Sequence, residues 1–216
     1  MSNFLNSSIG KKLIMSISGL FLIAFLLVHL TINLLTLAGP ETFNAAAHFM
    51  GTNIVMKIME PMLALGFLVH IVYSLILYAQ NLAARPVRYK VINQAETSSW
   101  ASRNMVFLGI VILAFLGIHL VNYFYKIKFT NDVTSEYHLV VGLFTTEYWY
   151  YIAIYVIGAI FLGLHLYHAF QSAFQTLGLN NSKWRARWNA IGLIYSLVIA
   201  LGFSFIPLYF LISELV

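Results

Sequence analysis

Five long stretches of this chain contain no charged residue, and they constrain its fold more than any other feature. They cover residues 13–40, 61–84, 104–125, 148–182 and 188–213. About 20 apolar residues are enough to cross the hydrocarbon core of a bilayer as a helix. Charged residues make up only 9% of the chain, against about 25% in an ordinary soluble domain. The sequence therefore predicts an all-α integral membrane bundle of five transmembrane helices.

The predicted helices belong to one domain that covers residues 1–216. They lie near residues 13–37, 60–84, 104–125, 149–176 and 189–213. Gly39 and Pro40 are expected to end the first helix, and residues 42–50 to form a short interfacial helix. The first apolar stretch follows Lys11 and Lys12, as in a secretory signal peptide, but it is too long for a signal core. We therefore expect it to remain as the first transmembrane helix.

The charged residues between the stretches predict how the bundle is oriented. With the N-terminus in the cytoplasm, the inner segments carry most basic residues, namely Lys11, Lys12, Arg85, Arg88, Lys90, Arg103, Lys183, Arg185 and Arg187. The outer segments carry Lys57, Lys126 and Lys128, and the acids Glu41, Glu60, Asp132, Glu136, Glu147 and Glu214. Cytoplasmic loops of membrane proteins are enriched in Lys and Arg. We therefore expect a cytoplasmic N-terminus and an outer C-terminus, and the net charge of +5 does not call for a nucleic-acid partner.

Four of the seven histidines fall one in each of the first four predicted helices, as His29, His70, His119 and His165. An ionisable side chain inside a membrane is costly and usually functional. A single one would more often be a hydrogen-bonded packing residue, but four at similar depth favour a cofactor. The chain has no cysteine, which excludes thiolate iron–sulfur ligation and covalent haem attachment in this subunit. Any metal centre must therefore be held by histidine.

Counting residues from the inner helix ends predicts how these histidines pair. His29 lies about 16 residues along the first helix and His119 about 15 along the third, so both are roughly 23 Å from the cytoplasmic edge. His70 and His165 lie about 14 and about 11 residues from their inner ends, which is closer to the cytoplasm. We therefore expect an outer pair, His29 with His119, and an inner pair, His70 with His165.

Glycines near the histidines offer room for a flat ring beside the backbone. Gly66, Gly117 and Gly163 lie within one turn of a candidate ligand, whereas Gly19 and Gly109 each precede one by ten residues. We expect Gly163 to admit a ring beside His165. Close packing of membrane helices is an alternative explanation for all five positions.

The sequence around the four histidines is specific enough to indicate a family. The segments are HLTINLLTLAGPETFNAAAHFM from His29, LVHIVYSL around His70, LGIHLV around His119 and GLHLYHAFQSAFQTLG around His165. Together they resemble the cytochrome b membrane anchor of succinate dehydrogenases and fumarate reductases, of the single-chain, five-helix, dihaem type found with menaquinone. The resemblance covers nearly the whole chain.

This resemblance implies two b-type haems, with the four histidines as axial ligands in the pairs given above. It implies that the chain passes electrons between a cytoplasmic iron–sulfur subunit and menaquinone, with quinone reduced or oxidised at this subunit. An FAD flavoprotein subunit would carry out the dicarboxylate chemistry. The resemblance also implies a multi-pass protein surrounded by lipid in the bacterial cytoplasmic (inner) membrane.

Haem propionates would need polar partners in this chain. Ser16 matches a family position that hydrogen-bonds a propionate. At the position of Thr176 the family can have a basic residue that contacts a propionate of the inner haem. We expect Arg103 or Lys183 to make that contact here instead. His168 follows His165 by three residues and is a rival ligand. The family pattern favours His165, which leaves His168 to bind a propionate or a water.

Two residues on the expected outer side of the membrane each have two possible roles. His48, in the AHFM segment of the loop after the first helix, either contacts the quinone or outer haem or is satisfied by backbone. Glu60, just before Pro61 at the expected outer start of the second helix, either stabilises the helix N-terminus or delivers protons to a quinone.

Two other functions remain open. A transporter or proton channel with an intramembrane histidine relay needs no cofactor and would be colourless, whereas a dihaem protein is red. The dihaem anchor of a hydrogenase or a formate dehydrogenase would usually have a different helix count and lack the FNAAAHFM segment. Subunits that co-purify with the chain would separate these anchors from the main interpretation.

Overall fold

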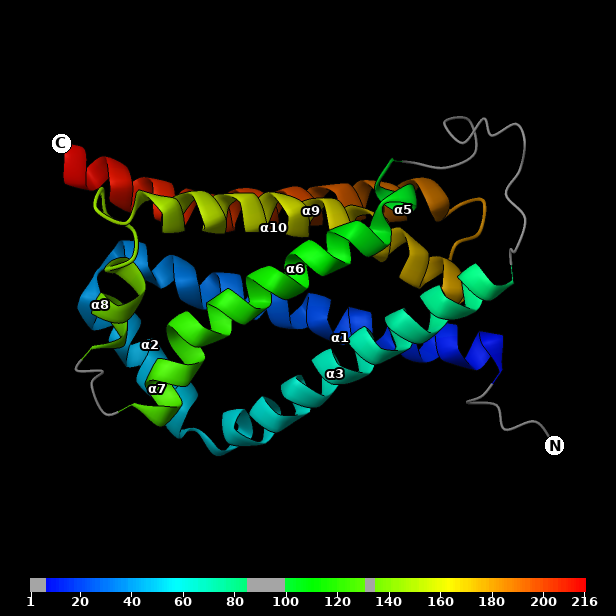
Figure 1. Ribbon diagram of the computed structural model, residues 1–216, viewed down its shortest axis with the longest axis horizontal. Helices are drawn as coiled ribbons and strands as arrows, with labels where there is room; N and C mark the ends of the chain where they lie inside the picture. Colours follow the sequence, from blue (N-terminus) through cyan, green and yellow to red (C-terminus); the bar gives the residue numbers. More distant parts are fainter. Residues whose placement is uncertain (1–6, 85–99, 131–134) are drawn as a thin grey trace.

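The computed structural model of the chain describes residues 7–84, 100–130 and 135–216. These residues form helices joined by short connections (Figure 1). Five spans are long and apolar enough to cross a membrane: Ser8–Ala38, Ile54–Ala83, Met105–Phe129, Trp149–Thr176 and Arg185–Leu215. For the described residues, the prediction of a helical protein with five membrane spans is confirmed. Arg85, Arg88, Lys90 and Asp132, to which the topology prediction assigned sides, lie outside these residues.

The first span begins and ends at well-defined capping residues. It consists of α1 (Ser8–Leu34) and a 3-10 turn, η2 (Leu35–Ala38). The Ser7 side chain accepts a hydrogen bond from the Gly10 N–H at 3.0 Å, which satisfies one of the donors that a helix start leaves free. The span ends at Gly39, whose φ of 101° is a conformation that side chains with a Cβ rarely adopt.

A short helix follows the first span, as expected, but it is longer than residues 42–50. Pro40 is the first residue of α2 (Pro40–Thr52), where its missing N–H costs nothing. Asn53 then caps the second span, since its side chain accepts a hydrogen bond from the Val55 N–H at 2.8 Å. That span is α3 (Ile54–Ala83), and it starts six residues before the predicted position.

The third span is irregular, whereas the last two are continuous. In the third, α6 (Met105–His119) continues through a π-helical segment, η3 (Leu120–Tyr125), into α7 (Lys126–Phe129). The fourth and fifth spans are α9 (Trp149–Thr176) and α10 (Arg185–Leu215). Two short helices, α5 (Trp100–Arg103) and α8 (Glu136–Val141), lie at opposite ends of the bundle (Figure 1). A bilayer core offers no water to backbone groups, so each span must satisfy its own N–H and C=O groups as a helix.

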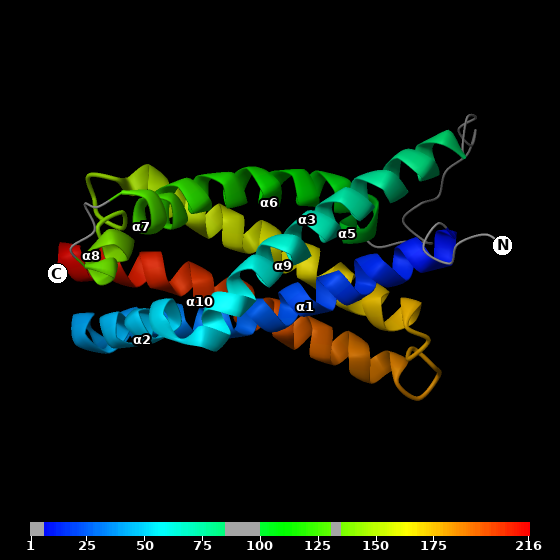
Figure 2. The same cartoon turned by 90° about the horizontal axis from the view of Figure 1, so that it is seen from below.

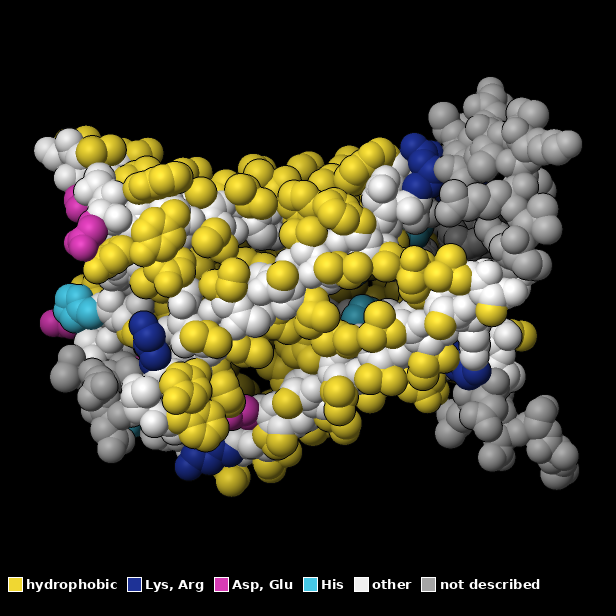
Figure 3. Space-filling view, in the orientation of Figure 1, with side chains coloured by type: hydrophobic (Ala, Val, Ile, Leu, Met, Phe, Trp, Pro, Cys, Tyr) yellow, Lys and Arg dark blue, Asp and Glu magenta, His cyan; other side chains and the backbone are white. Residues whose placement is uncertain are grey.

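The helices surround a space that is open on one side. α9 and α10 run side by side, and α1 packs against α3, α9 and α10 (Figures 1 and 2). α6 packs against α9. Within the described residues, α3 and α6 make few contacts with each other, and Figure 3 shows the surface hollowed between them, with a histidine side chain visible in the hollow. Leu77 is the only buried residue of α3, all of whose residues are described.

Charged side chains gather at the two ends of the bundle (Figure 3). The end where α1 begins, here called the basic end, carries Lys11, Lys12, Arg103, Lys183, Arg185 and Arg187. The opposite end, here called the acidic end, carries the described acids Glu41, Glu60, Glu136, Glu147 and Glu214, with Lys57, Lys126 and Lys128. The apolar spans lie between these ends.

Candidate functional site

The first histidine pair joins α1 and α6 in the half of the bundle nearer the acidic end. The ring centroids of His29 and His119 lie 5.7 Å apart, and the ring planes make an angle of 86°. Phe25 stacks on His29 with its centroid at 5.2 Å, and Phe203 of α10 lies 5.6 Å from the same ring. The two imidazoles therefore meet from different helices in an aromatic environment.

The second pair joins α3 and α9. The ring centroids of His70 and His165 lie 6.5 Å apart, at an interplanar angle of 76°. His168, one turn further along α9, makes no ring contact with His70 in the described part of the chain. The structure thus brings together the same pairs that the depth count predicted, with His165 rather than His168 beside His70.

The two pairs lie at different levels along the bundle. His119 is 6.1 Å from Tyr155 of α9, centroid to centroid, whereas His165, ten residues later on that helix, meets His70. Ten residues of α-helix span about 15 Å. Counting residues from the inner helix ends predicted a smaller separation. The count fails because α3 is tilted relative to α1 (Figure 2), so a position along α3 does not measure its depth in the bundle directly.

A metal held between two imidazoles requires about this separation of the rings. Two metal–nitrogen bonds of about 2 Å, with about 1 Å from each nitrogen to its ring centre, place the centroids about 6 Å apart. The observed 5.7 and 6.5 Å lie on either side of that value. No group of three or more metal-ligating side chains occurs among the described residues. The porphyrin of a haem leaves only axial positions to the protein, and each pair offers the two imidazoles that such positions would need.

The Nδ1 atoms of the four imidazoles have different partners. His70 Nδ1 lies 3.4 Å from the Ser18 hydroxyl of α1. Nδ1 of His119 and of His165 are buried and make no hydrogen bond with the described part of the chain. Buried polar atoms without a partner are rare in proteins and need an explanation. These two mark places where a bound group or water would complete the site.

Near His29 the Asn33 amide donates to the backbone and also lies close to the imidazole. The Asn33 amide nitrogen donates a 2.8 Å hydrogen bond to the His29 carbonyl. The same nitrogen is 3.5 Å from His29 Nδ1, which is at the limit of a hydrogen bond.

Of the five glycines, one borders a histidine and two are unpacked among the described residues. A Cβ on Gly19 would lie 3.3 Å from His70 Cε1, so this position of α1 makes room for the imidazole. A Cβ on Gly109 or Gly117 of α6 would meet no atom within 4 Å. Neither glycine packs against another helix in the described part of the chain.

The other two glycines serve helix packing. A Cβ on Gly66 would lie 2.8 Å from the Phe21 ring of α1, and one on Gly163 would lie 2.7 Å from the Ala200 Cβ of α10. The expectation that Gly163 admits a ring beside His165 is therefore wrong. Gly163 instead lets α9 and α10 approach closely, which was the alternative explanation.

The candidates for propionate contacts lie toward the basic end. Ser16 is buried on α1, Arg103 ends α5, and Lys183 is exposed between α9 and α10. The Thr176 hydroxyl donates to the Ser172 carbonyl at 2.9 Å, so it is engaged within its own helix.

The two quinone candidates lie at the surface near the acidic end. His48 is exposed on α2, and its backbone carbonyl accepts a hydrogen bond from the Thr52 hydroxyl at 2.7 Å. Glu60 lies in the second turn of α3, so the proposed stabilisation of a helix N-terminus is wrong, because that effect is confined to the first turn. Its carboxylate instead pairs with Lys128 of α7 at 2.8 Å, with 43% and 40% of the two side chains exposed.

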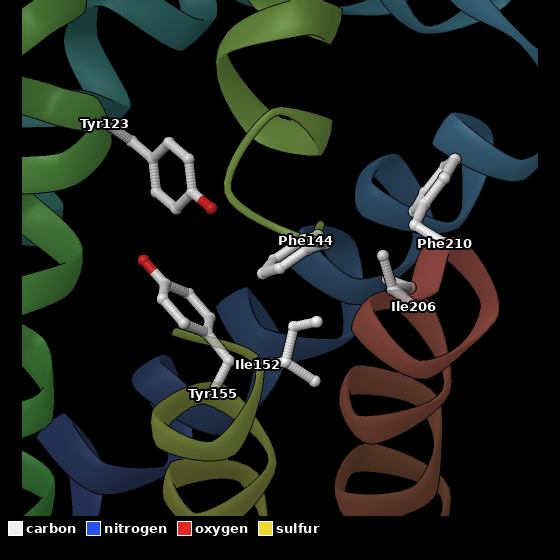
Figure 4. Packing of buried hydrophobic residues seen from close by; sticks show 6 residues of the cluster. All are labelled: Tyr123, Phe144, Ile152, Tyr155, Ile206 and Phe210. Carbon is white, nitrogen blue, oxygen red and sulfur yellow. The ribbon is translucent and has the colours of Figure 1, made fainter. Parts of the chain in front are cut away.

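A buried aromatic and polar cluster beside His119 was not singled out in the sequence. The Tyr123 ring lies 5.1 Å from His119, centroid to centroid, and the Asn122 amide donates to the Tyr155 hydroxyl at 3.2 Å. Figure 4 shows the hydroxyl groups of Tyr123 and Tyr155 pointing toward each other. The π-helical segment η3 buries both Asn122 and Tyr123. The spacing of four residues between His119 and Tyr123 was the available signal, but it does not reveal the π-helix.

Comparison of the chain with protein-family models, with curated proteins and with solved structures finds no match.

Proposed function

We propose that this chain is the cytochrome b membrane anchor of a succinate dehydrogenase or fumarate reductase. It holds two b haems, one between His29 and His119 and one between His70 and His165, and passes electrons between a cytoplasmic iron–sulfur subunit and menaquinone. The dicarboxylate is converted in an FAD flavoprotein subunit of the same complex. The membrane is the bacterial cytoplasmic membrane, with the basic end inside.

The observation that carries this proposal is the pair of interhelical imidazole contacts, at 5.7 and 6.5 Å, stacked along the bundle. Packing alone does not account for two such contacts from four different spans, because ionisable residues are avoided in membrane interiors. The open side between α3 and α6 leaves room for flat groups. The gathering of basic residues at one end supports the orientation.

Haem supplies one-electron redox chemistry, tuned by its axial ligands and by burial. The residues of the chain would bind the haem, exclude water and contact the quinone. His29, His70, His119 and His165 would bind iron through a ring nitrogen, and the aromatic side chains around the outer pair exclude water. Ser16, Arg103, His168 and Lys183 are the polar groups proposed for the propionates. His48 and Glu60 lie where a quinone can exchange protons with water at the acidic end.

A histidine relay is less well supported by the contacts. Proton transfer along a relay needs continuous hydrogen bonds between its members. The two pairs are about 15 Å apart along the bundle.

The test is purification of the detergent-solubilised complex, followed by its haem-to-chain ratio and its reduced-minus-oxidised absorption spectrum. We expect a ratio of two, a b-type spectrum, and co-purification of an iron–sulfur protein and a flavoprotein. A colourless chain would overturn the haem assignment. Two haems with a hydrogenase or formate dehydrogenase subunit would retain the haems and overturn the assignment to succinate or fumarate.

A further inference from the structure

The imidazole of His70 is seated against a short segment of α1 that the sequence analysis did not connect with it. The Ser18 hydroxyl oxygen lies 3.4 Å from His70 Nδ1. Gly19, the next residue, lets the α1 backbone come close, since a Cβ there would lie 3.3 Å from His70 Cε1 and 3.6 Å from Nδ1. Ser18 is itself buried.

The hydroxyl of Ser18 has a defined direction. It donates its hydrogen to the Met15 carbonyl at 3.0 Å. A hydroxyl has one hydrogen and two lone pairs, so the oxygen can only accept on the side that faces His70. The 3.4 Å contact is longer than an ordinary hydrogen bond, and with the hydroxyl hydrogen on Met15 the bond that it allows is one that His70 Nδ1 donates.

This arrangement selects one tautomer of the imidazole. A neutral imidazole carries one proton, shared between two nitrogens. With that proton on Nδ1, Nε2 presents its lone pair, which is the form that binds a metal. A hydrogen bond from the opposite ring nitrogen also orients a metal-bound histidine and raises its basicity.

The helix that carries His70 is attached to the same segment. The Ser74 hydroxyl donates to the His70 carbonyl at 2.7 Å and lies 3.5 Å from the Met15 sulfur. Met15 thus contacts Ser74 through its side chain and Ser18 through its carbonyl. The contacts of Met15, Ser18 and Gly19 therefore hold α3 in register with α1 at the level of His70.

We propose that Ser18 is a positioning residue for the inner haem, acting through His70: it holds the proton on Nδ1, orients the ring and lowers the haem's midpoint potential. This inference depends on the proposed function, since it assumes iron between His70 and His165. A more basic axial ligand favours ferric over ferrous iron, which gives the direction of the effect. It is specific to one haem, because Ser18 contacts His70, whereas His119 Nδ1 of the outer pair has no such partner among the described residues.

The test is a redox titration of the complex carrying Ser18→Ala. Loss of an outer partner of a metal-bound histidine typically lowers metal affinity about 10–100-fold. A tenfold loss that falls on ferric and not on ferrous iron raises a one-electron potential by about 59 mV. We expect the potential of one haem to rise by about that amount, with the other haem unchanged and two haems bound. The low-spin ferric signal of the same haem should shift in electron paramagnetic resonance.

Two further variants make the outcome decisive. Ser18→Thr keeps the hydroxyl and should restore the potential. Ser74→Ala removes a hydroxyl that contacts the His70 carbonyl but not its ring, and it should leave the potential unchanged. If Ser18→Ala loses one haem, full occupancy in Ser18→Thr still supports the inference, and failure of Thr to rescue overturns it.

Failure of this inference is distinguishable from failure of the proposed function. A wild-type chain without haem would overturn the function itself. Two haems whose potentials do not change in Ser18→Ala, or change equally in Ser74→Ala, would overturn the role of Ser18 alone.

Discussion

The side chains of His165 and His168 have different neighbours although they lie one helical turn apart. Three residues on an α-helix differ in direction by about 60°, so one haem can be met well by only one of them. His165 meets His70, whereas His168 lies about 4.5 Å nearer the basic end. At that position a neutral imidazole can hydrogen-bond a propionate or a water.

Alanine variants of these two residues should therefore differ in haem content. His165→Ala should lower the haem count from two toward one, because it removes an axial bond. His168→Ala should keep both haems and at most shift the potential of the inner one. The measurement is the haem-to-chain ratio of each purified complex. Retention of two haems in His165→Ala, with loss of one in His168→Ala, would make His168 the ligand.

Glu60 offers a second test at this scale, through its ion pair with Lys128. General acid–base groups contribute about 100-fold or more, so Glu60→Gln should cut quinone turnover at least about tenfold while both haems remain. Lys128→Gln breaks the same ion pair but leaves the carboxylate, so it should preserve turnover. Either variant should cost little stability, since exposed ion pairs contribute about 0–1 kcal/mol. Full turnover in Glu60→Gln would place the quinone elsewhere.

At the scale of elements, the close approach of α9 and α10 depends on Gly163. A Cβ there would lie 2.7 Å from the Ala200 Cβ and 3.3 Å from the Ser196 carbonyl oxygen. Gly163→Ala should force the helices apart at a cost of about 1–3 kcal/mol. We expect a lower thermal midpoint of the solubilised complex, with the haem count still two.

The matched control is Gly51→Ala. Gly51 lies near the end of α2, and a Cβ there would meet no atom within 4 Å. The thermal midpoint of the Gly51→Ala variant should stay the same or rise slightly, because Ala is more favourable than Gly within a helix. Equal midpoints for both variants would show that α9 and α10 tolerate a wider separation.

The sequence predicted the spans and the histidine pairs well, for physical reasons. A bilayer forces apolar stretches to be helical, and one histidine per span leaves few ways to pair them. Local packing was not predictable in the same way. Neither the π-helical segment η3 nor the seat of His70 on Ser18 follows from helical periodicity, because both depend on which neighbouring helix lies opposite. The early start of α3 depends on the Asn53 cap, which lies outside the apolar stretch.

At the scale of the whole molecule, the separation of the basic and acidic ends predicts the topology. The chain has no cysteine, so single cysteines can report which side each end occupies. Ser213→Cys, near the end of α10, should react with a membrane-impermeant maleimide in intact cells. Ser182→Cys, between α9 and α10, should react only after the membrane is opened. The reverse pattern would place the basic end outside.

The distance between the histidine levels sets how strongly electron transfer responds to the membrane potential. About 15 Å is half of the roughly 30 Å hydrocarbon core. A full crossing of one charge involves about 2.3 kcal/mol per 100 mV, so transfer between the proposed haems involves about half of that. Protons moving alongside would offset this dependence.

Few residues of α3 are buried, and this affects how the newly made protein is assembled in the cell. A span held mainly by α1, with an open side toward α6, is incompletely anchored until the space between them is filled. In cells starved of haem precursor, we expect the chain to be inserted normally but degraded faster, as a pulse-chase measurement of its half-life would show. An unchanged half-life would mean that lipid alone holds α3. The supply of cofactor would thus determine how much of the protein accumulates, because membrane proteases would degrade each copy in which α3 is not yet packed against a bound cofactor.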